Sequence, residues 1–204
     1  MKPSIKVLLL DIGGVLLTDG WETHSRERAA AYFGLDPDEF NQRHRNVFDA
    51  YESGKMSLDE YLQLVVFYKE RPFTADEFKD FMMEESKPFP EMINMLTDLK
   101  HTSHLPIIAV NNEPKELNEH RIQQFSLTNI IDIFVSSCYV NVRKPDKKLY
   151  EIALNITQVK PEEALYIDDR LVYIEVATQM GIQAIHHTDL ESTQSQLSTY
   201  GISL

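Results

Sequence analysis

The sequence is poor in cysteine and in residues of positive charge. It has one cysteine, Cys138, and 20 Lys or Arg against 32 Asp or Glu, a formal net charge of −12 over 204 residues. A single cysteine cannot form a disulfide within the chain, so we expect a cytoplasmic protein with a disulfide-free core. The acidic balance argues against a nucleic-acid partner and against an anionic membrane surface, because both carry negative charge.

Long hydrophobic runs are also missing. The apolar run Val7–Leu10 stops at Asp11, far short of the roughly 20 residues that cross a membrane. We therefore expect neither a membrane segment nor a signal peptide. With 43% hydrophobic residues, the chain is long enough to bury a substantial core as one domain with a large insertion. A monomer and a homodimer are both compatible with these features.

The stretch VLLLDIGGVL at Val7–Leu16 is typical of a buried strand that ends at a carboxylate. Strands buried on both faces are apolar at every position, and Gly13 and Gly14 permit a tight turn after Asp11. Ligands of open α/β sheets bind outside the carboxyl ends of the strands, which places Asp11 where it can meet a substrate. The alternative is that Asp11 only caps a turn and that the two glycines only let the chain bend.

The pattern between residues 22 and 83 is that of amphipathic helices. Gly34 ends a helical pattern, Asp36-Pro37 is typical of a helix start, and Ser57 and Thr74 each begin a capping box. We expect four helices that form a small bundle, inserted after the first strand and lying over Asp11 as a lid. The residues expected in the bundle core are Phe40, Phe48, Tyr61, Leu62, Val65, Phe78 and Phe81.

Strand and helix patterns alternate after residue 87. Buried strands are predicted at 106–110, 130–135, 164–167 and 183–185, and helices are predicted around 92–99, 147–154 and 171–180. Such alternation is typical of a parallel sheet covered by helices on both faces. The expected fold is therefore α/β, a doubly wound parallel sheet with an inserted helical-bundle cap. The expected core domain comprises residues 1–16 and 87–204, and the cap domain comprises residues 17–86.

Polar residues follow four of the predicted buried segments. In chain order they are Asp11, Asn111-Asn112, Lys144 and Asp168-Asp169. A carboxylate nucleophile, an amide donor, a fixed cation and a carboxylate pair are the groups that hold a phosphoryl group together with a divalent metal. Taken singly, each has an ordinary explanation as a turn, a solvated loop or a helix cap. Their order along the chain favours the phosphate and metal site.

Four motifs together resemble the haloacid dehalogenase-like hydrolase superfamily. They are DIGGV at 11–15, VNN at 110–112, RKPD at 143–146 and YIDDR at 166–170. The resemblance covers essentially the whole chain, and the predicted insertion is similar to the helical type-one cap of that family. It implies a Mg²⁺-dependent phosphatase that acts on a small phosphorylated metabolite through an aspartyl-phosphate.

The resemblance also implies roles for individual residues. Asp11 is the expected nucleophile, and Lys144 is expected to bridge the nucleophile and the phosphate. Asn111, Asn112 and Gly14 are expected in the phosphate-binding turns.

The expected metal is Mg²⁺. Its implied ligands are Asp11, the backbone carbonyl of Gly13, and the acids Asp168 and Asp169, of which Asp169 is the better match to the family's fourth motif.

Three positions depart from the family pattern. Gly13 stands where most phosphatases of the family have a second aspartate, Asn111 replaces a serine or threonine, and Tyr173 replaces an Asp or Asn. The second aspartate acts as general acid and base, and losing such a group typically costs about a hundred- to ten-thousandfold in rate. Asp19 and His24, which follow the first motif, are the nearest candidates to replace it.

Two other functions remain open on these residues. A dehalogenase-type hydrolase releases a halide that needs no proton, so the absent acid would harm it less, although its chemistry leaves Asp168-Asp169 without a role. The other is a domain that binds a phosphorylated ligand and turns it over slowly or not at all.

Overall fold

The computed structural model describes residues 4–202 of the chain. Five strands form one parallel sheet in the order β3-β2-β1-β4-β5. Their bounds are Val7–Leu10 (β1), Ile107–Asn111 (β2), Ile133–Ser136 (β3), Ala164–Asp168 (β4) and Gln183–His186 (β5). Because β1 is central and the order reverses on either side of it, the sheet is doubly wound, as predicted.

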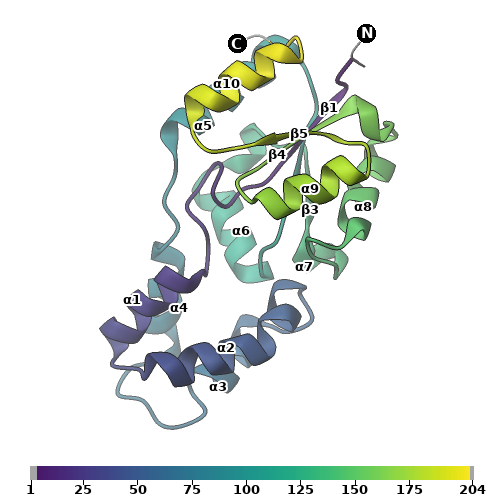
Figure 1. Ribbon diagram of the computed structural model, residues 1–204. Helices are drawn as coiled ribbons and strands as arrows, with labels where there is room; N and C mark the ends of the chain where they lie inside the picture. Colours follow the sequence, from purple (N-terminus) through teal and green to yellow (C-terminus); the bar gives the residue numbers. More distant parts are fainter. Residues whose placement is uncertain (1–3, 203–204) are drawn as a thin grey trace.

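Helices cover both faces of this sheet (Figure 1). The α-helices of this part are α5 (Pro90–Ser103), α6 (Lys115–Gln124), α7 (Ser137–Val140), α8 (Lys147–Thr157), α9 (Leu171–Gln179) and α10 (Leu190–Thr199), with short 3-10 helices η1 (Leu127–Asn129) and η2 (Pro161–Glu163). Alternate β1 residues enter different cores, because successive side chains of a strand point to opposite faces. Leu8 and Leu10 pack with α5 and α10, whereas Val7 and Leu9 pack with α8 and α9.

Four further helices lie together at one end of the molecule (Figure 1). They are α1 (Thr23–Phe33), α2 (Pro37–Glu52), α3 (Leu58–Val65) and α4 (Ala75–Glu84). The predicted starts of α2, α3 and α4 are confirmed, since Asp36 caps α2 and Ser57 and Thr74 form capping boxes. Gly34 ends α1 in the left-handed conformation, with φ of 63°.

The four helices share a core of their own, which is rich in aromatic side chains. Phe40, Tyr61 and Phe78 are buried in it, and Phe81 packs against it. The prediction for Phe48 was wrong. Its ring lies partly exposed at a cavity beside this core, where it stacks on His44.

Two adjacent connections join the helical bundle to the sheet. Leu17 pairs with Pro88 in an antiparallel bridge, and the Phe89 N–H donates to the Leu16 carbonyl at 2.8 Å. The Thr18 N–H donates to the Lys87 carbonyl, also at 2.8 Å. The predicted cap boundaries at 16/17 and 86/87 lie beside these bonds; the division into two domains remains a prediction.

The remaining differences from the predicted elements have local causes. β3 begins at Ile133 rather than at residue 130, because Ile130 and Ile131 fill the core from the turn after η1. Helix α6 was not predicted. Its buried side chains include Asn118 and Arg121, so it lacks the apolar stripe by which amphipathic helices are recognised.

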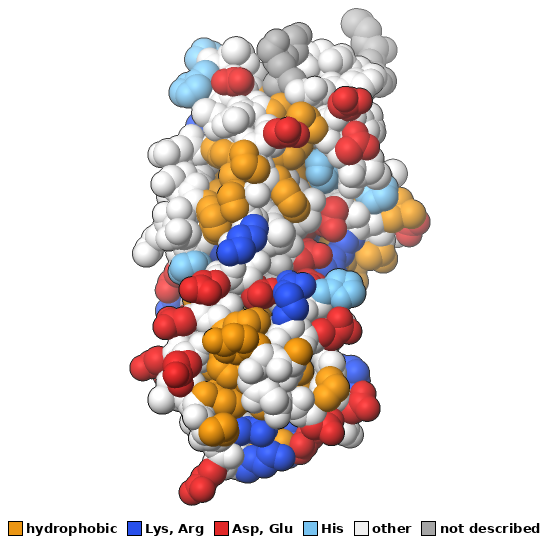
Figure 2. All heavy atoms as spheres, turned by 90° about the vertical axis from the view of Figure 1, so that its left-hand side faces the viewer, with side chains coloured by type: hydrophobic (Ala, Val, Ile, Leu, Met, Phe, Trp, Pro, Cys, Tyr) orange, Lys and Arg blue, Asp and Glu red, His pale blue; other side chains and the backbone are white. Residues whose placement is uncertain are grey.

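Hydrophobic side chains gather in patches on one face of the molecule (Figure 2). Figure 2 shows hydrophobic side chains in patches above and below a band where acidic, basic and histidine side chains gather. Within residues 4–202, no helix combines the length and apolar character needed to cross a bilayer.

Gly54 gives a test of how the bundle packs on the sheet domain. Gly34 and Gly54 have similar backbones, with φ of 63° and 68°, but a Cβ on Gly54 would lie 2.2 Å from the Cys138 carbonyl oxygen, whereas a Cβ on Gly34 meets nothing within 4 Å. We expect Gly34→Ala to lower the free energy of unfolding by about 1–2 kcal/mol, the cost of the left-handed conformation. Gly54→Ala should cost clearly more, because backbone cannot move aside as a side chain can.

Urea unfolding of the two variants beside wild type measures both effects. Equal losses of stability would contradict the close packing of Gly54 against α7.

Candidate active site

Asp11 lies at the carboxyl end of the central strand and is almost completely buried, with 7% of its surface exposed. Its Oδ1 accepts a hydrogen bond from the Ile12 N–H at 2.9 Å. Its Oδ2 lies 2.9 Å from the Nζ of Lys144. One oxygen is thus fixed by the turn after β1, and the other faces a buried cation.

Lys144 connects the residues of three chain segments. Its side chain is fully buried, and its Nζ lies 2.7 Å from Asp168 Oδ2 and 3.1 Å from the Tyr166 hydroxyl, in addition to its contact with Asp11. Its ammonium group also lies 4.8 Å from the ring centroid of Tyr173. Residues 11, 144 and 168, far apart in the sequence, therefore form one charged cluster.

Asn112 holds the backbone that carries Lys144. Its side-chain amide donates to the Lys144 carbonyl at 3.0 Å, and its Oδ1 accepts from the Lys144 N–H at 2.8 Å. A paired amide of this kind fixes both the distance and the orientation of the peptide that it contacts. Asn112 thereby sets where the Lys144 side chain begins.

The two consecutive acids after β4 differ in how they are satisfied. Both oxygens of Asp168 have protein partners: Oδ2 contacts Lys144 and accepts from the Tyr166 hydroxyl, and Oδ1 accepts from the Arg170 N–H at 2.7 Å. The Oδ1 of Asp169 is buried and has no hydrogen-bond partner among residues 4–202. Asp11, Asp168 and Asp169 each place a carboxylate oxygen within 4.8 Å of the other two, a group that is able to hold a metal ion.

The electrostatics of the site show an excess of negative charge. Burial raises the pKa of Asp11 to about 8, with Lys144 opposing the shift and Asp168 and Asp169 adding to it. Burial, followed by repulsion from Asp168 and Asp19, raises the pKa of Asp169 to about 6. For Lys144, burial lowers the pKa, but Asp11 and Asp168 outweigh it and hold the pKa above its usual range. One lysine therefore does not offset all these acids, and a divalent cation would favour their ionised forms.

The two glycines after Asp11 have different surroundings. Gly14 has a positive φ of 71°, and a Cβ on it would lie 2.3 Å from the carboxyl carbon of Asp169. Only glycine leaves room there for this acid. Gly13 does not have a positive φ, so its backbone admits a side chain, and the nearest atom to a Cβ at this position is Asp19 Oδ1 at 3.2 Å.

The three residues expected to bind phosphate are already engaged within the protein. The Asn111 amide donates to Asn118 at 3.0 Å, and the Gly14 N–H donates to the Leu17 carbonyl at 2.8 Å. Asn112 lines a cavity next to Asp11, but its side-chain amide bonds to Lys144. Their role in substrate binding remains a prediction.

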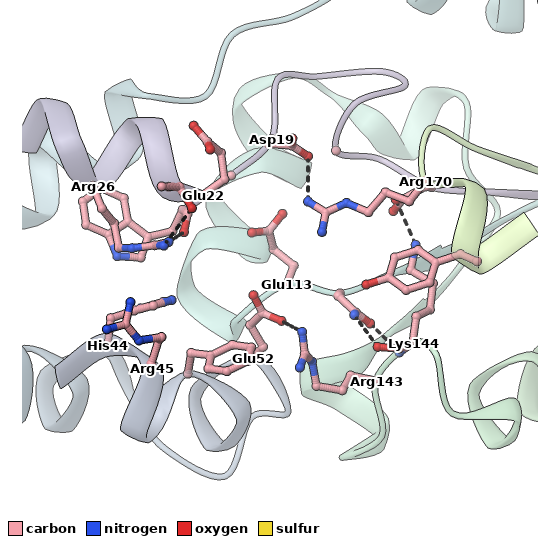
Figure 3. A pocket seen from close by; sticks show the side chains of 18 of the residues that line it. Asp19, Glu22, Arg26, His44, Arg45, Glu52, Glu113, Arg143, Lys144 and Arg170 are labelled. Carbon is pink, nitrogen blue, oxygen red and sulfur yellow. Dashed lines mark hydrogen bonds and ion pairs between the residues drawn. The ribbon is translucent and has the colours of Figure 1, made fainter. Parts of the chain in front are cut away.

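A cavity of about 440 Å³ lies between this cluster and the helical bundle, and its wall is strongly charged (Figure 3). Asp11, Asn112 and Lys144 are at one end. The charged or titratable side chains from the bundle are Glu22, Arg26, His44, Arg45 and Glu52. Those from the sheet domain include Glu113, Arg121, Arg143 and Arg170.

Sequence reasoning found only part of this wall. Of the polar and aromatic side chains in the predicted lid, Trp21, Glu22 and Arg45 line it, whereas His24 and Tyr51 do not. His24 is highly exposed and pairs with Glu27 on the surface of α1.

Most of the charged wall was missed. Glu113 directly follows the VNN motif, and Arg143 is the first residue of the RKPD motif. Their closeness to the motifs is the sequence feature that could have identified them as wall residues. Nothing in the sequence indicates that Arg26, His44 or Glu52 lines a cavity, because polar residues are common in amphipathic helices such as α1 and α2.

The chain is similar to several known proteins in sequence and in fold. The family model for haloacid dehalogenase-like hydrolases matches residues 16–186. Flavin mononucleotide hydrolase 1 of Arabidopsis thaliana is 24% identical over 204 residues, which cover 100% of this chain and 80% of that protein. Three other curated relatives are much longer proteins, of which this chain spans 9%, 23% and 20%.

Solved structures share the fold at low sequence identity. A haloacid dehalogenase family enzyme from Bacteroides thetaiotaomicron, in complex with magnesium and inorganic phosphate, has a TM-score of 0.75 at 16% identity, covering 91% of this chain and 95% of its own. L-2-haloacid dehalogenase from Xanthobacter autotrophicus, with chloropropionic acid covalently bound, has a TM-score of 0.62 at 14% identity, covering 98% and 85%.

Such identities show a common fold and no more. The family match itself covers residues 16–186, which is most of the chain and includes Lys144, Asp168 and Asp169, whereas Asp11 precedes the matched range. The membership expected from the four motifs is therefore confirmed: this chain belongs to the haloacid dehalogenase-like hydrolases.

Proposed function

We propose that this protein is a Mg²⁺-dependent phosphatase that acts on a small phosphorylated metabolite through an aspartyl-phosphate on Asp11. The observation that carries this proposal is the position of Asp11, which lies 2.9 Å from the Lys144 ammonium and shares a potential metal site with Asp168 and Asp169. A nucleophilic carboxylate beside a fixed cation and a divalent metal is the arrangement that phosphoryl transfer requires.

Asp11 and Lys144 have complementary tasks in this proposal. The Asp11 carboxylate attacks phosphorus, the bond to the leaving oxygen breaks, and water later hydrolyses the aspartyl-phosphate to inorganic phosphate. Lys144 keeps Asp11 oriented and offsets negative charge on the phosphoryl oxygens. Because Asn112 and Asp168 hold Lys144 from two sides, the cation is already in place before a substrate binds.

The residues present fit a Mg²⁺ ion. Asp11, Asp168 and Asp169 supply hard carboxylate oxygens, as Mg²⁺ prefers, and the Gly13 carbonyl completes the proposed set. The buried, unpartnered Oδ1 of Asp169 is the strongest sign, because a buried carboxylate oxygen without a partner is costly unless a cation or water satisfies it. When bound, the ion would neutralise phosphoryl charge.

The helical bundle is proposed as a cap domain, residues 17–86, that selects the substrate. It contributes Trp21, Arg26, His44 and Phe48 to the wall of the cavity above Asp11. Flavin mononucleotide, which names the Arabidopsis relative, is a phosphate monoester with a polar and an aromatic part. It is therefore a suitable first compound for a substrate panel, together with sugar phosphates.

A dehalogenase activity is the second candidate. The absence of an acid at Gly13 favours it, since halide departs without a proton, and the Xanthobacter dehalogenase has the same fold. The unpartnered oxygen of Asp169 argues for a cation, which a metal-independent displacement does not need.

One assay separates the candidates. We expect phosphate release from p-nitrophenyl phosphate that requires Mg²⁺ and stops with a chelator, and no chloride release from 2-chloropropionate. Metal-independent chloride release would establish the dehalogenase instead. Neither activity, with phosphate ligands still bound, would indicate a binding domain.

Asp11→Asn tests the covalent mechanism. The amide is a poor nucleophile and a poor metal ligand, so we expect phosphate release to fall to background, while the far-UV circular dichroism spectrum and the thermal midpoint show a folded protein. Retained turnover in the folded variant would rule out attack by Asp11.

Asp169→Asn tests the metal site. We expect the Mg²⁺ concentration for half-maximal phosphate release to rise at least about tenfold, since even indirect partners of a metal site are worth that much. Isothermal titration with Mg²⁺ alone should show the same loss of affinity. Asp98→Asn, an exposed acid on α5, is the matched control and should leave both values unchanged. Unaltered Mg²⁺ affinity in Asp169→Asn would remove this residue from the metal site.

A further inference from the structure

The space beside Gly13 is occupied by another acid of the same chain. A Cβ built on Gly13 would lie 3.2 Å from Asp19 Oδ1 and 3.6 Å from Asp19 Cα. The carboxyl oxygen of an aspartate lies roughly 2.4 Å from its own Cβ, as bond lengths near 1.5 Å and ordinary angles require. An aspartate at position 13 whose side chain pointed toward Asp19 would therefore bring a carboxyl oxygen to within about an ångström of the place that Asp19 Oδ1 occupies.

Asp19 faces the reacting end of the cavity. It lines the same cavity as Asp11 and Lys144, and its side chain is 38% exposed, so both a substrate and water can reach it. Its Oδ1 lies 3.6 Å from Nη2 of Arg170, and Figure 3 shows the two side chains facing each other. This ion pair is long and half-exposed, so it directs the carboxyl group without engaging it fully.

The backbone on either side of Asp19 is anchored. The Thr18 carbonyl accepts a hydrogen bond from the buried Arg121, and the Thr18 N–H donates to the Lys87 carbonyl at 2.8 Å. A Cβ on Gly20 would lie 2.4 Å from Glu113 Oε1, so this residue is closely packed as well. The position of Asp19 is consequently set by both the sheet domain and the connections to the bundle.

The other acids of the cavity already have close partners. Glu22 caps α1, accepting from the His24 and Ser25 N–H groups at 2.8 and 2.9 Å. Glu113 is buried against Arg121, and Glu52 pairs with Arg143 at 2.6 Å.

The histidine of the cavity wall is also engaged. The His44 Nδ1 lies 2.9 Å from the Tyr61 hydroxyl, and burial lowers its pKa to about 3, which leaves the ring neutral.

We propose that Asp19 is the general acid and base of the phosphatase reaction, replacing the aspartate that Gly13 lacks. The proposal rests on the phosphatase function given above. In the first step, Asp11 attacks phosphorus, the bond from phosphorus to the leaving oxygen breaks, and the protonated Asp19 carboxyl gives its proton to that oxygen. In the second step, the Asp19 carboxylate takes a proton from water as the water oxygen attacks phosphorus, which releases Asp11 and inorganic phosphate.

The test compares Asp19→Asn and Asp19→Ala with wild type on two aryl phosphates. The first step is followed as the rate of phosphoenzyme formation by rapid quench. With p-nitrophenyl phosphate, whose leaving group needs little protonation, we expect this rate to fall only slightly. With phenyl phosphate, whose leaving group needs a proton, we expect the rate to fall about a hundred- to ten-thousandfold. In the second step the attacking water lacks a base. Phosphoenzyme should therefore accumulate with p-nitrophenyl phosphate, as seen by intact-protein mass spectrometry after acid quench.

A rescue variant separates catalysis from structure. In Gly13→Asp/Asp19→Ala the new carboxyl enters the space that Asp19 vacates, and the backbone of Gly13, which lacks a positive φ, admits it. We expect the double variant to turn over phenyl phosphate at least about tenfold faster than Asp19→Ala does. A merely structural role of Asp19 would not produce this gain. His24→Ala is the control, since His24 lies outside the cavity, and should match wild type.

The outcomes distinguish this proposal from the phosphatase function itself. Mg²⁺-dependent turnover in wild type, with Asp19→Asn and Asp19→Ala unchanged on both substrates, would overturn the role of Asp19 and leave the phosphatase intact. Loss in Asp19→Ala with the same factor for both substrates, no phosphoenzyme and no rescue would assign Asp19 a structural role only. Absence of phosphatase activity in wild type would overturn both.

Discussion

The buried ammonium group of Lys144 is the interaction on which the site depends. A lysine removed from water is stable as a cation only where carboxylates compensate its lost hydration, and here Asp11 and Asp168 lie 2.9 and 2.7 Å from it. These two acids leave the ends of adjacent strands, β1 and β4. The pairing of those strands therefore fixes the distance between the carboxylates, and the lysine fixes their orientation.

This cluster carries more negative than positive charge, and that excess suits it to binding a cation. Three carboxylates gather around one lysine, and burial makes their ionised forms costly, as the raised pKa of Asp11 shows. A divalent cation bound at these carboxylates would reduce that cost. A site of this kind is suited to a substrate that brings its own negative charge together with a metal, as phosphate esters do.

In the wall of the cavity above the cluster, positive and negative side chains are more evenly balanced. Most of its charged side chains are paired within the wall, among them Arg121 with Glu113 and Arg143 with Glu52. Paired charges shape a polar pocket without giving it a strong net field. Specificity for the rest of a substrate would then come from shape and from individual hydrogen bonds, supplied by the helical bundle and the sheet domain together.

The sequence by itself determined the local features of this protein. An unbroken apolar run predicts β1, capping boxes begin α3 and α4, Gly34 ends α1, and four motifs in order indicate the family, because each of these signals depends on residues that are neighbours in the chain. The alternation of strands and helices was likewise sufficient for the doubly wound fold.

The tertiary structure alone decided which side chains meet. Nothing in the sequence shows that Asn112 bonds to the backbone of Lys144, that Phe48 leaves the bundle core for the cavity, or that Asp19 occupies the space beside Gly13. These contacts join segments whose approach depends on how the bundle packs on the sheet. Packing of that kind is a collective result of many long-range contacts and leaves no periodic trace in the residues themselves.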